Sequence, residues 1–260
     1  MSDFDHTSIA VRDAPRHLAW LRRHLGATPL LGQVLPGFRY VLSHLGDARA
    51  GARLELMDAA GPPGPRHGPG FLRHFLDRHG EGPHHLTFTV PDVGHAIERV
   101  ERLGLTVVNT DLAHPPWRET FIRPDEVHGV VIQLADTSVG YPPTAELLAT
   151  RDRDPTRLPG NREGRDPHWW TAAWQVPPGP VAYLRSTTLR STDPALSHRL
   201  FAEVLGGEVL GGEGGEPVYR WPGGVLVVRP ARTPGVDRLT LAGGPGDFHI
   251  GTARFTQEET

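Results

Sequence analysis

Apolar and polar residues alternate along residues 4–11, and the same alternation returns from His85 onward. Such alternation is typical of a strand with one buried face. Each run opens on a histidine that precedes an aspartate by seven residues: His6 precedes Asp13, and His85 precedes Asp92. Aspartate is a favoured residue just before a helix, and apolar residues at helical spacing follow both of these. The pattern predicts two copies of a strand-and-helix unit.

Each copy is expected to continue as β-α-β-β-β. The first helix follows Asp13 and ends at Gly26, and the second follows Asp92 and ends at Gly104, since glycine commonly ends helices. Between the copies, a loop rich in proline and glycine leads into one short helix at 71–76. The later strands of the two copies are expected at Phe38–Leu45, Ala52–Met57, Leu105–Asn109, Glu119–Ile122 and Gly129–Leu134.

A nearly constant offset relates polar residues of the two copies. His6 and His85 are 79 residues apart, and Glu55 and Gln133 are 78 apart. In each copy these side chains lie on the strand face opposite the one that packs the helix. A repeat of this kind is the signature of a duplicated structural unit. We therefore predict, for residues 1–137, an α+β fold of paired βαβββ modules whose sheets form an open, cup-shaped mixed β-barrel.

The remainder of the chain differs in composition. Residues 138–179 are rich in Pro, Arg, Asp and Gly. We predict a linker or wrapping arm there, whose tryptophans dock on a neighbouring domain because an exposed cluster would be an unusual apolar patch. These tryptophans are Trp169, Trp170 and Trp174.

The repeated unit appears a third time, in weaker form, within residues 180–260. Ser186 again precedes an aspartate by seven residues, and a fourth start follows at Asp237. Ser186 and Arg238 now occupy the histidine positions, so we predict a degenerate additional βαβββ module without metal ligands. Two roles stay open for it. It is either a structural module that extends the barrel or mediates dimerisation, or a lid that supplies Arg185, Arg190 or Arg238 to the substrate.

The composition removes several kinds of chemistry. The chain of 260 residues has no cysteine and no lysine, its basic residues being 27 arginines. Disulfides, thiolate ligands, cysteine nucleophiles and lysine Schiff bases are therefore excluded. A formal net charge of −3 gives no reason to expect a nucleic acid or an anionic membrane as partner, and no apolar run approaches the roughly 20 residues that span a bilayer. We expect a cytoplasmic homodimer that acts on a small molecule.

Four polar side chains of the repeat suggest a metal site. If the two modules pair side by side, His6, Glu55, His85 and Gln133 converge on the concave floor of the cup. Two imidazoles, a carboxylate and an amide oxygen suit a divalent ion such as Zn²⁺, Co²⁺, Ni²⁺, Mn²⁺ or Fe²⁺. The chain has fifteen histidines, and a histidine taken singly is more often structural than a ligand. The equivalent placement of two of them favours the metal.

The chain resembles the vicinal oxygen chelate superfamily of glyoxalases, bleomycin-resistance proteins and dioxygenases, and within it the methylmalonyl-CoA epimerase-like branch. The resemblance covers residues 4–135 and places the family's four metal ligands on His6, Glu55, His85 and Gln133. His84 is left with a supporting or structural role. Epimerases of this branch usually carry glutamate at the last ligand position, where this chain has Gln133. The segments that carry the resemblance are Asp5–Val11, Leu54–Leu56, Phe71–Leu86 and Phe121–Leu134.

The resemblance also implies a reaction. Family members chelate neighbouring oxygens of a substrate, and a carboxylate then moves a proton through a metal-stabilised enediolate. Glu55 is the first candidate for this base and Glu119 the second, although Glu119 equally suits a surface ion pair. Trp117, Arg118 and Arg123 are candidates for binding the substrate, the arginines through a carboxylate or phosphate.

Three classes of function follow. The first is a metal-dependent isomerase, epimerase or lyase acting on a 2-oxo, 1,2-diketone-like or thioester substrate. The second is a non-haem iron dioxygenase, because two histidines and one glutamate match its ligand set. The third is a metal-free binding protein of the antibiotic-resistance type, which fits less well because four plausible ligands are present.

Overall fold

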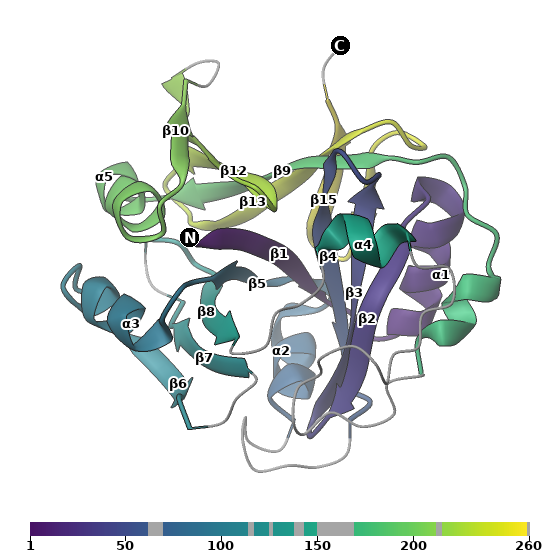
Figure 1. Ribbon diagram of the computed structural model, residues 1–260, viewed down its shortest axis with the longest axis horizontal. Helices are drawn as coiled ribbons and strands as arrows, with labels where there is room; N and C mark the ends of the chain where they lie inside the picture. The colour runs from purple at the N-terminus through teal and green to yellow at the C-terminus, as the bar shows by residue number, and fades with distance from the viewer. Residues whose placement is uncertain are drawn as a thin grey trace.

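The computed structural model describes residues 1–61, 70–113, 117–124, 127–137, 143–149, 169–211 and 215–258. Its strands form two separate sheets, one of eight strands and one of seven. In Figure 1 the first sheet occupies the lower part of the molecule and the second lies above its central strands. The fold is α+β, with paired βαβββ modules in the first sheet and related modules in the second, as predicted.

The first half of the chain forms the eight-stranded sheet, in the order β2-β3-β4-β1-β5-β8-β7-β6. The central strands β1 and β5 are antiparallel, while β1 is parallel to β4 and β5 is parallel to β8. The two modules therefore join edge to edge through their first strands. Their elements are β1 (Asp3–Ala10), α1 (Ala14–Leu25), β2 (Thr28–Leu35), β3 (Phe38–Gly46), β4 (Gly51–Asp58), α2 (Phe71–His79), β5 (Gly82–Thr89), α3 (Val93–Glu101), β6 (Val107–Asp111), β7 (Trp117–Ile122) and β8 (Val131–Thr137).

The second half repeats this plan in a sheet of order β10-β11-β12-β9-β13-β15-β14. The pairing of β9 with β13 is antiparallel, and that of β12 with β9 is parallel, as in the first sheet. The predicted third copy is complete, and the fourth continues into two further strands that the sequence pattern did not indicate. These elements are β9 (Tyr183–Ser191), α5 (Pro194–His198), η3 (Arg199–Val204), β10 (Glu208–Leu210), β11 (Val218–Trp221), β12 (Gly224–Pro230), β13 (Gly235–Ala242), β14 (Phe248–Ile250) and β15 (Ala253–Gln257).

The helices α1 and α3 begin where the sequence indicates, and α1 also ends there. In contrast, α3 ends at Glu101, before the expected Gly104, and α2 extends beyond the expected residues 71–76 to His79. Asp13 accepts a hydrogen bond from the backbone N–H of Arg16 (3.0 Å), and Asp92 accepts one from that of His95 (2.7 Å). α1 ends at Gly26, whose φ of 63° lies in the left-handed region that glycine adopts freely. In Figure 1, α1 and α3 lie at opposite flanks of the first sheet.

The strands expected from the sequence pattern do not include β2. It contains Pro29 and Gly32, two residues that usually interrupt strands. They are tolerated because β2 is the outermost strand of its sheet.

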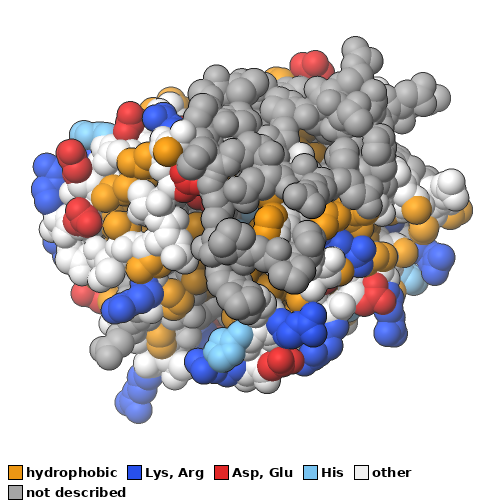
Figure 2. Space-filling model, turned by 90° about the horizontal axis from the view of Figure 1, so that it is seen from below, with side chains coloured by type: hydrophobic (Ala, Val, Ile, Leu, Met, Phe, Trp, Pro, Cys, Tyr) orange, Lys and Arg blue, Asp and Glu red, His pale blue; other side chains and the backbone are white. Residues whose placement is uncertain are grey.

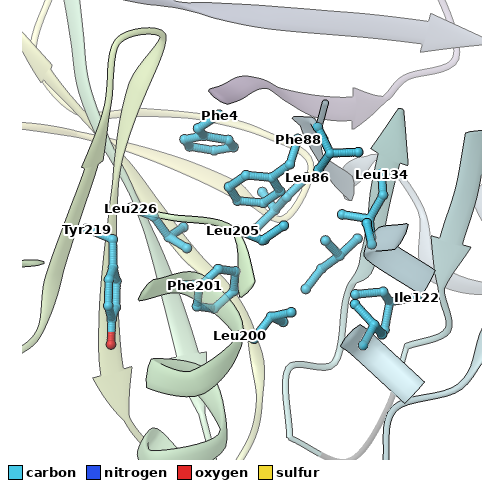
Figure 3. Packing of buried hydrophobic residues seen from close by; sticks show 14 of the residues in the cluster. Phe4, Leu86, Phe88, Ile122, Leu134, Leu200, Phe201, Leu205, Tyr219 and Leu226 are labelled. Carbon is cyan, nitrogen blue, oxygen red and sulfur yellow. The ribbon is translucent and has the colours of Figure 1, made fainter. Parts of the chain in front are cut away.

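The two halves share their hydrophobic cores. Phe4, Leu86 and Phe88 of the first sheet pack against Phe201 and Tyr219 of the second half (Figure 3). A second core joins residues of α1 and β4 to residues of β9, β13 and β15. The C-terminal half therefore forms its own sheet and does not extend the first one. It covers the side of β1 and β5 that is turned away from the cup.

The linker predicted at 138–179 is only partly described, and it contains α4 (Thr144–Ala149) and the short helix η2 (Thr171–Gln175). Trp170 is buried, and its indole N–H donates to the carbonyl oxygen of Gly32 (3.1 Å). The guanidinium of Arg39 lies 4.4 Å from the ring centre of Trp169. These two tryptophans dock on the first half as predicted, whereas the side chain of Trp174 lies outside the described part. None of the described helices is long and apolar enough to cross a membrane.

Candidate metal centre

Two β-bulges shape the floor of the cup. The pairing of β1 with β5 slips by one residue at Asp5 and again at His84. Each bulge lies directly before one of the predicted histidine ligands. Because a bulge interrupts the alternation of a strand, two successive side chains turn to the same side. Asp5 and His6 therefore both line the cavity, as do His84 and His85.

Three of the four predicted ligands converge on one point. Suitable ligand atoms of His6, Glu55 and His85 all lie within 4.8 Å of one another, and all three side chains are buried. The Nε2 atoms of His6 and His85 lie 3.7 Å and 3.6 Å from Glu55 Oε2. Ligands about 2.1 Å from a tetrahedral ion are separated by about 3.4 Å. These two separations are close to that value, so the donor set suits a divalent ion.

Gln133 lies beside this cluster within a chain of hydrogen bonds. Its Oε1 accepts from Thr87 Oγ1 (2.7 Å), and the same hydroxyl lies 3.0 Å from His6 Nε2. Its Nε2 donates to Glu119 Oε2 (2.7 Å). Glu119 Oε2 also accepts from the indole N–H of Trp117 (2.9 Å). The amide is therefore held with its oxygen toward the histidines and its nitrogen toward Glu119.

The pKa values in the cluster reflect competition between burial and charge. Burial lowers the pKa of His6, but Glu55 and Asp5 outweigh it and raise that pKa to about 9. Burial raises the pKa of Asp5, but Arg53 and His6 outweigh it and lower that pKa to about 2. Burial dominates at His85 and lowers its pKa well below the usual value. Two carboxylates thus favour positive charge here, whether from a proton or from a metal ion.

Three residues of this cluster were not singled out from the sequence. Asp5 Oδ1 lies 2.6 Å from His6 Nδ1. The hydroxyl of Ser8 donates to Glu55 Oε2 and lies 2.9 Å from His85 Nε2. Thr87 links His6 to Gln133. The alternation places Ser8 and Thr87 on the ligand face, so this signal was available for them. Asp5 escapes the pattern because the bulge moves it.

The cluster forms the floor of a cavity of about 760 Å³. Leu31, Leu35, Phe38, Tyr40 and Leu42 of β2 and β3, together with Met57 and Phe71, make one wall largely apolar. On the other side lie Val108, Asn109, Trp117, Phe121 and Arg123. The volume of this cavity suits a small organic molecule.

On the face of the molecule shown in Figure 2, basic and acidic side chains are interspersed along the periphery, with apolar side chains between them.

Arg118, a predicted substrate-binding residue, lies elsewhere. Its Nε donates to Asp136 Oδ1 (2.6 Å), and Asp136 Oδ2 accepts from the first backbone N–H of α3 (2.8 Å). Arg39 and Asp58 form the same arrangement at the start of α1. The two arginines are 79 residues apart and the two aspartates 78 apart, the same separations as between His6 and His85 and between Glu55 and Gln133. Arg118 thus holds a helix to its sheet, whereas Trp117, Glu119 and Arg123 line the cavity.

The C-terminal half reaches the cavity at one turn. Of the described residues in that half, only Pro222 and Gly223 line it. The three arginines considered for a lid form ion pairs with acidic residues instead: Arg185 with Glu258, and Arg190 and Arg238 with Asp237. The backbone N–H of Gly223 donates to Asp3 Oδ1 (2.7 Å). The second half therefore supports the cavity from behind.

The model of the Glyoxalase/Bleomycin resistance protein/Dioxygenase superfamily matches residues 3–134, about half of the chain. The chain belongs to this superfamily. The fold of the whole chain, C-terminal half included, is also found in a hypothetical protein from Staphylococcus aureus. That structure has a TM-score of 0.59 and 9% sequence identity over 99% of each chain.

Two methylmalonyl-CoA epimerases are similar to this chain over a shorter range. The enzyme from Mycobacterium tuberculosis is 27% identical over 53% of this chain and 89% of its own, with a TM-score of 0.43. A variant of the Streptomyces coelicolor enzyme, in complex with 2-nitronate-propionyl-CoA, is 25% identical over 53% of this chain and 98% of its own, also with a TM-score of 0.43. A search of the curated proteins finds no match.

Proposed function

We propose that the protein is a metal-dependent isomerase, epimerase or lyase that moves a proton on a carbon next to a substrate carbonyl. The observation that carries this proposal is the convergence of His6, Glu55 and His85 on the floor of a cavity of about 760 Å³. Membership of a superfamily that contains many enzymes supports it. The substrate class is a 2-oxo, 1,2-diketone-like or thioester compound.

The metal would be held by His6, Glu55 and His85, with the amide oxygen of Gln133 as a fourth ligand. Zn²⁺, Co²⁺, Ni²⁺, Mn²⁺ and Fe²⁺ all suit this donor set. When bound, such an ion supplies Lewis acidity that polarises the substrate carbonyl.

Glu55 is the proposed base. Burial raises the pKa of Glu55, but His6 and other partners outweigh it and lower that pKa, so the group is ionised at neutral pH. Its carboxylate lies at the floor of the cavity, where a substrate carbon beside the carbonyl would lie within reach. Glu119 is the second candidate, although two hydrogen bonds to its Oε2 already commit it to Gln133 and Trp117.

Trp117 and Arg123 are the proposed substrate-binding residues of the second module. Both line the cavity, and an arginine there suits a substrate carboxylate or phosphate. The apolar wall formed by β2 and β3 lies across the cup and suits a hydrocarbon part of the same substrate. Arg118 is not among the proposed substrate-binding residues, because Asp136 binds its guanidinium.

Metal analysis tests the proposal most directly. Protein purified without chelators is expected to contain about one divalent ion per chain, measured by plasma emission spectroscopy. His85→Ala is expected to lose this ion and the activity, because two ligands remain of the buried three. The matched control is His249→Ala, a change at an exposed histidine of β14, which is expected to keep both. Full activity and metal content in His85→Ala would refute the metal site.

Dioxygenase chemistry is the second candidate, because two histidines and one carboxylate are also the ligands of non-haem Fe(II) oxygenases. Iron in anaerobically purified protein, together with oxygen consumption on addition of a catechol or a 2-oxo acid, would favour it. Proton exchange at a substrate carbon without oxygen uptake would favour the isomerase or lyase.

A further inference from the structure

The bulge that precedes each histidine ligand recurs throughout the molecule. In the first sheet the bulged residues are Asp5 and His84. In the second sheet the pairing of β9 with β13 slips at Arg185 and Asp237, the equivalent positions. The bulge is therefore a feature of the repeat. What differs between copies is the residue placed there.

In the first sheet, each bulged side chain contacts the histidine that follows it. Asp5 Oδ1 lies 2.6 Å from His6 Nδ1, and His84 Nδ1 lies 2.9 Å from His85 Nδ1. Both imidazoles therefore use Nδ1 for this contact and turn Nε2 toward Glu55. A histidine that binds a metal through one ring nitrogen is commonly oriented by a hydrogen bond at the other.

From this geometry we infer that Asp5 and His84 are positioning residues for the two imidazole ligands, and that Asp5 is the stronger of the two. The inference rests on the proposed metal site and adds to it a pair of residues that no ligand pattern selects. Neither residue binds the metal itself. Asp5 fixes the ring orientation and the tautomer of His6, because a carboxylate can only accept from Nδ1–H. His84 fixes the ring orientation of His85, so that both Nε2 atoms are directed toward the ion.

Asp5 is itself held firmly. Its Oδ2 lies 2.8 Å from Nη2 of Arg53, and its side chain is 11% exposed. The carboxylate thus bridges a guanidinium and the imidazole of His6, which leaves it little freedom to turn away. A carboxylate acceptor also increases the basicity of the ring and strengthens its bond to a metal.

His84 is held differently, by aromatic rings of the short helix α2. Its ring centre lies 5.9 Å from that of Phe71 and 4.7 Å from that of Phe75. An imidazole is a weaker acceptor than a carboxylate and carries no negative charge. Its replacement is therefore expected to weaken metal binding less than replacement of Asp5.

The test is titration of the metal-free full-length protein with Co²⁺, followed by calorimetry and by the visible absorption of the ion. Asp5→Ala is expected to weaken Co²⁺ binding about 10- to 100-fold and to change the absorption spectrum. Asp5→Asn keeps an acceptor for Nδ1 and is expected to fall between Asp5→Ala and the wild type. His84→Ala is expected to have the smaller effect of the two alanine changes.

Asp237→Ala is the control, since it replaces the bulged residue of the second sheet that is equivalent to His84. It is expected to leave Co²⁺ binding unchanged. Thermal unfolding of every metal-free variant separates loss of folding from loss of binding, and Asp5→Asn serves if Asp5→Ala does not fold. Wild-type affinity and spectrum in a folded Asp5→Ala, or in Asp5→Asn should that variant replace it, would overturn the inference while leaving the metal site intact. Absence of Co²⁺ binding in the wild type would overturn both.

Discussion

At the scale of single residues, the orientation of Gln133 is fixed from both sides. Thr87 donates to its oxygen, and Glu119 accepts from its nitrogen. Only an amide satisfies both contacts, because a carboxylate has no donor for Glu119. The glutamine thus matches the glutamate that lies next to it, and Glu55 supplies the carboxylate of the proposed ligand set.

Replacement of Gln133 by glutamate tests this match. Gln133→Glu would place a second carboxylate about 2.7 Å from that of Glu119, which both removes a hydrogen bond and adds repulsion. We expect the metal-free protein to lose about 2 kcal/mol of unfolding free energy, measured by urea denaturation in the presence of a chelator. The double variant Glu119→Gln/Gln133→Glu restores a donor between the two positions and is expected to recover most of the loss. Equal stabilities of the single and double variants would contradict the match.

The offset of the repeat predicted the proposed ligands but did not separate them from structural residues. His6 and His85 share their 79-residue spacing with Arg39 and Arg118, and only the first pair lines the cavity. A repeat preserves residues for folding as well as for function. The structure brings His6, Glu55 and His85 together and places Arg118 outside the cavity lining. Spacing alone does not reveal this difference, because it carries no information about which face an arginine uses.

At the scale of elements, an arginine and an aspartate hold each of the helices α1 and α3 to the first sheet. Asp136 accepts from the first N–H of α3 and from Arg118, and Asp58 accepts from the first N–H of α1 and from Arg39. Both aspartates are buried. The contacts satisfy backbone donors that a helix otherwise leaves open at its start.

Arg118→Ala distinguishes this structural role from substrate binding. The change is expected to lower the unfolding temperature only slightly, since the side chain is 36% exposed and solvent screens the pair. KM for a substrate identified by the activity assay is expected to stay at the wild-type value. Arg123→Ala is the comparison, because Arg123 lines the cavity, and it is expected to raise KM with little change in unfolding temperature. If Arg118→Ala raised KM and Arg123→Ala lowered only the unfolding temperature, Arg118 would be the residue that contacts the substrate.

Strands were harder to predict than helices. Asp13 and Asp92 begin helices through local hydrogen bonds that a sequence displays directly. β2 depends on pairing with a distant strand, and its proline and glycine conceal it. The bulges at Asp5 and His84 are likewise set by register between two strands. Register arises from packing across the sheet, so a single sequence does not reveal it.

At the scale of the whole molecule, the two halves form one packed unit. Leu200, Phe201 and Leu205 of the second half are fully buried against residues of the first sheet and α3. The sequence predicted an additional module at the C-terminus. The sequence did not predict where this module lies, because the alternation of residues along a strand does not show what packs against the strand's outer face.

Truncation after residue 137 tests the shared core. Removal of the C-terminal half would expose the apolar side of β1 and β5, so the fragment is expected to aggregate when expressed alone. The soluble fraction and size-exclusion chromatography measure this outcome. Phe201→Ala in the full chain is the milder comparison and is expected to cost about 3–5 kcal/mol while the protein still binds metal. A soluble, monodisperse fragment that binds metal would contradict the role assigned to the shared core.

The predicted homodimer stays a prediction that light scattering on the full chain would check.

The turn at Gly223 has a consequence for how the cavity can be changed. A side-chain carbon at that position would lie 2.5 Å from the carbonyl oxygen of Phe4, so the turn accepts nothing larger than glycine. The same turn lines the cavity beside Asp3. Of the described part of the C-terminal half, the third module therefore contributes directly to the wall of a cavity that the first two modules build. A change in this turn would alter the wall of the cavity while leaving the proposed ligands on β1, β4, β5 and β8 untouched.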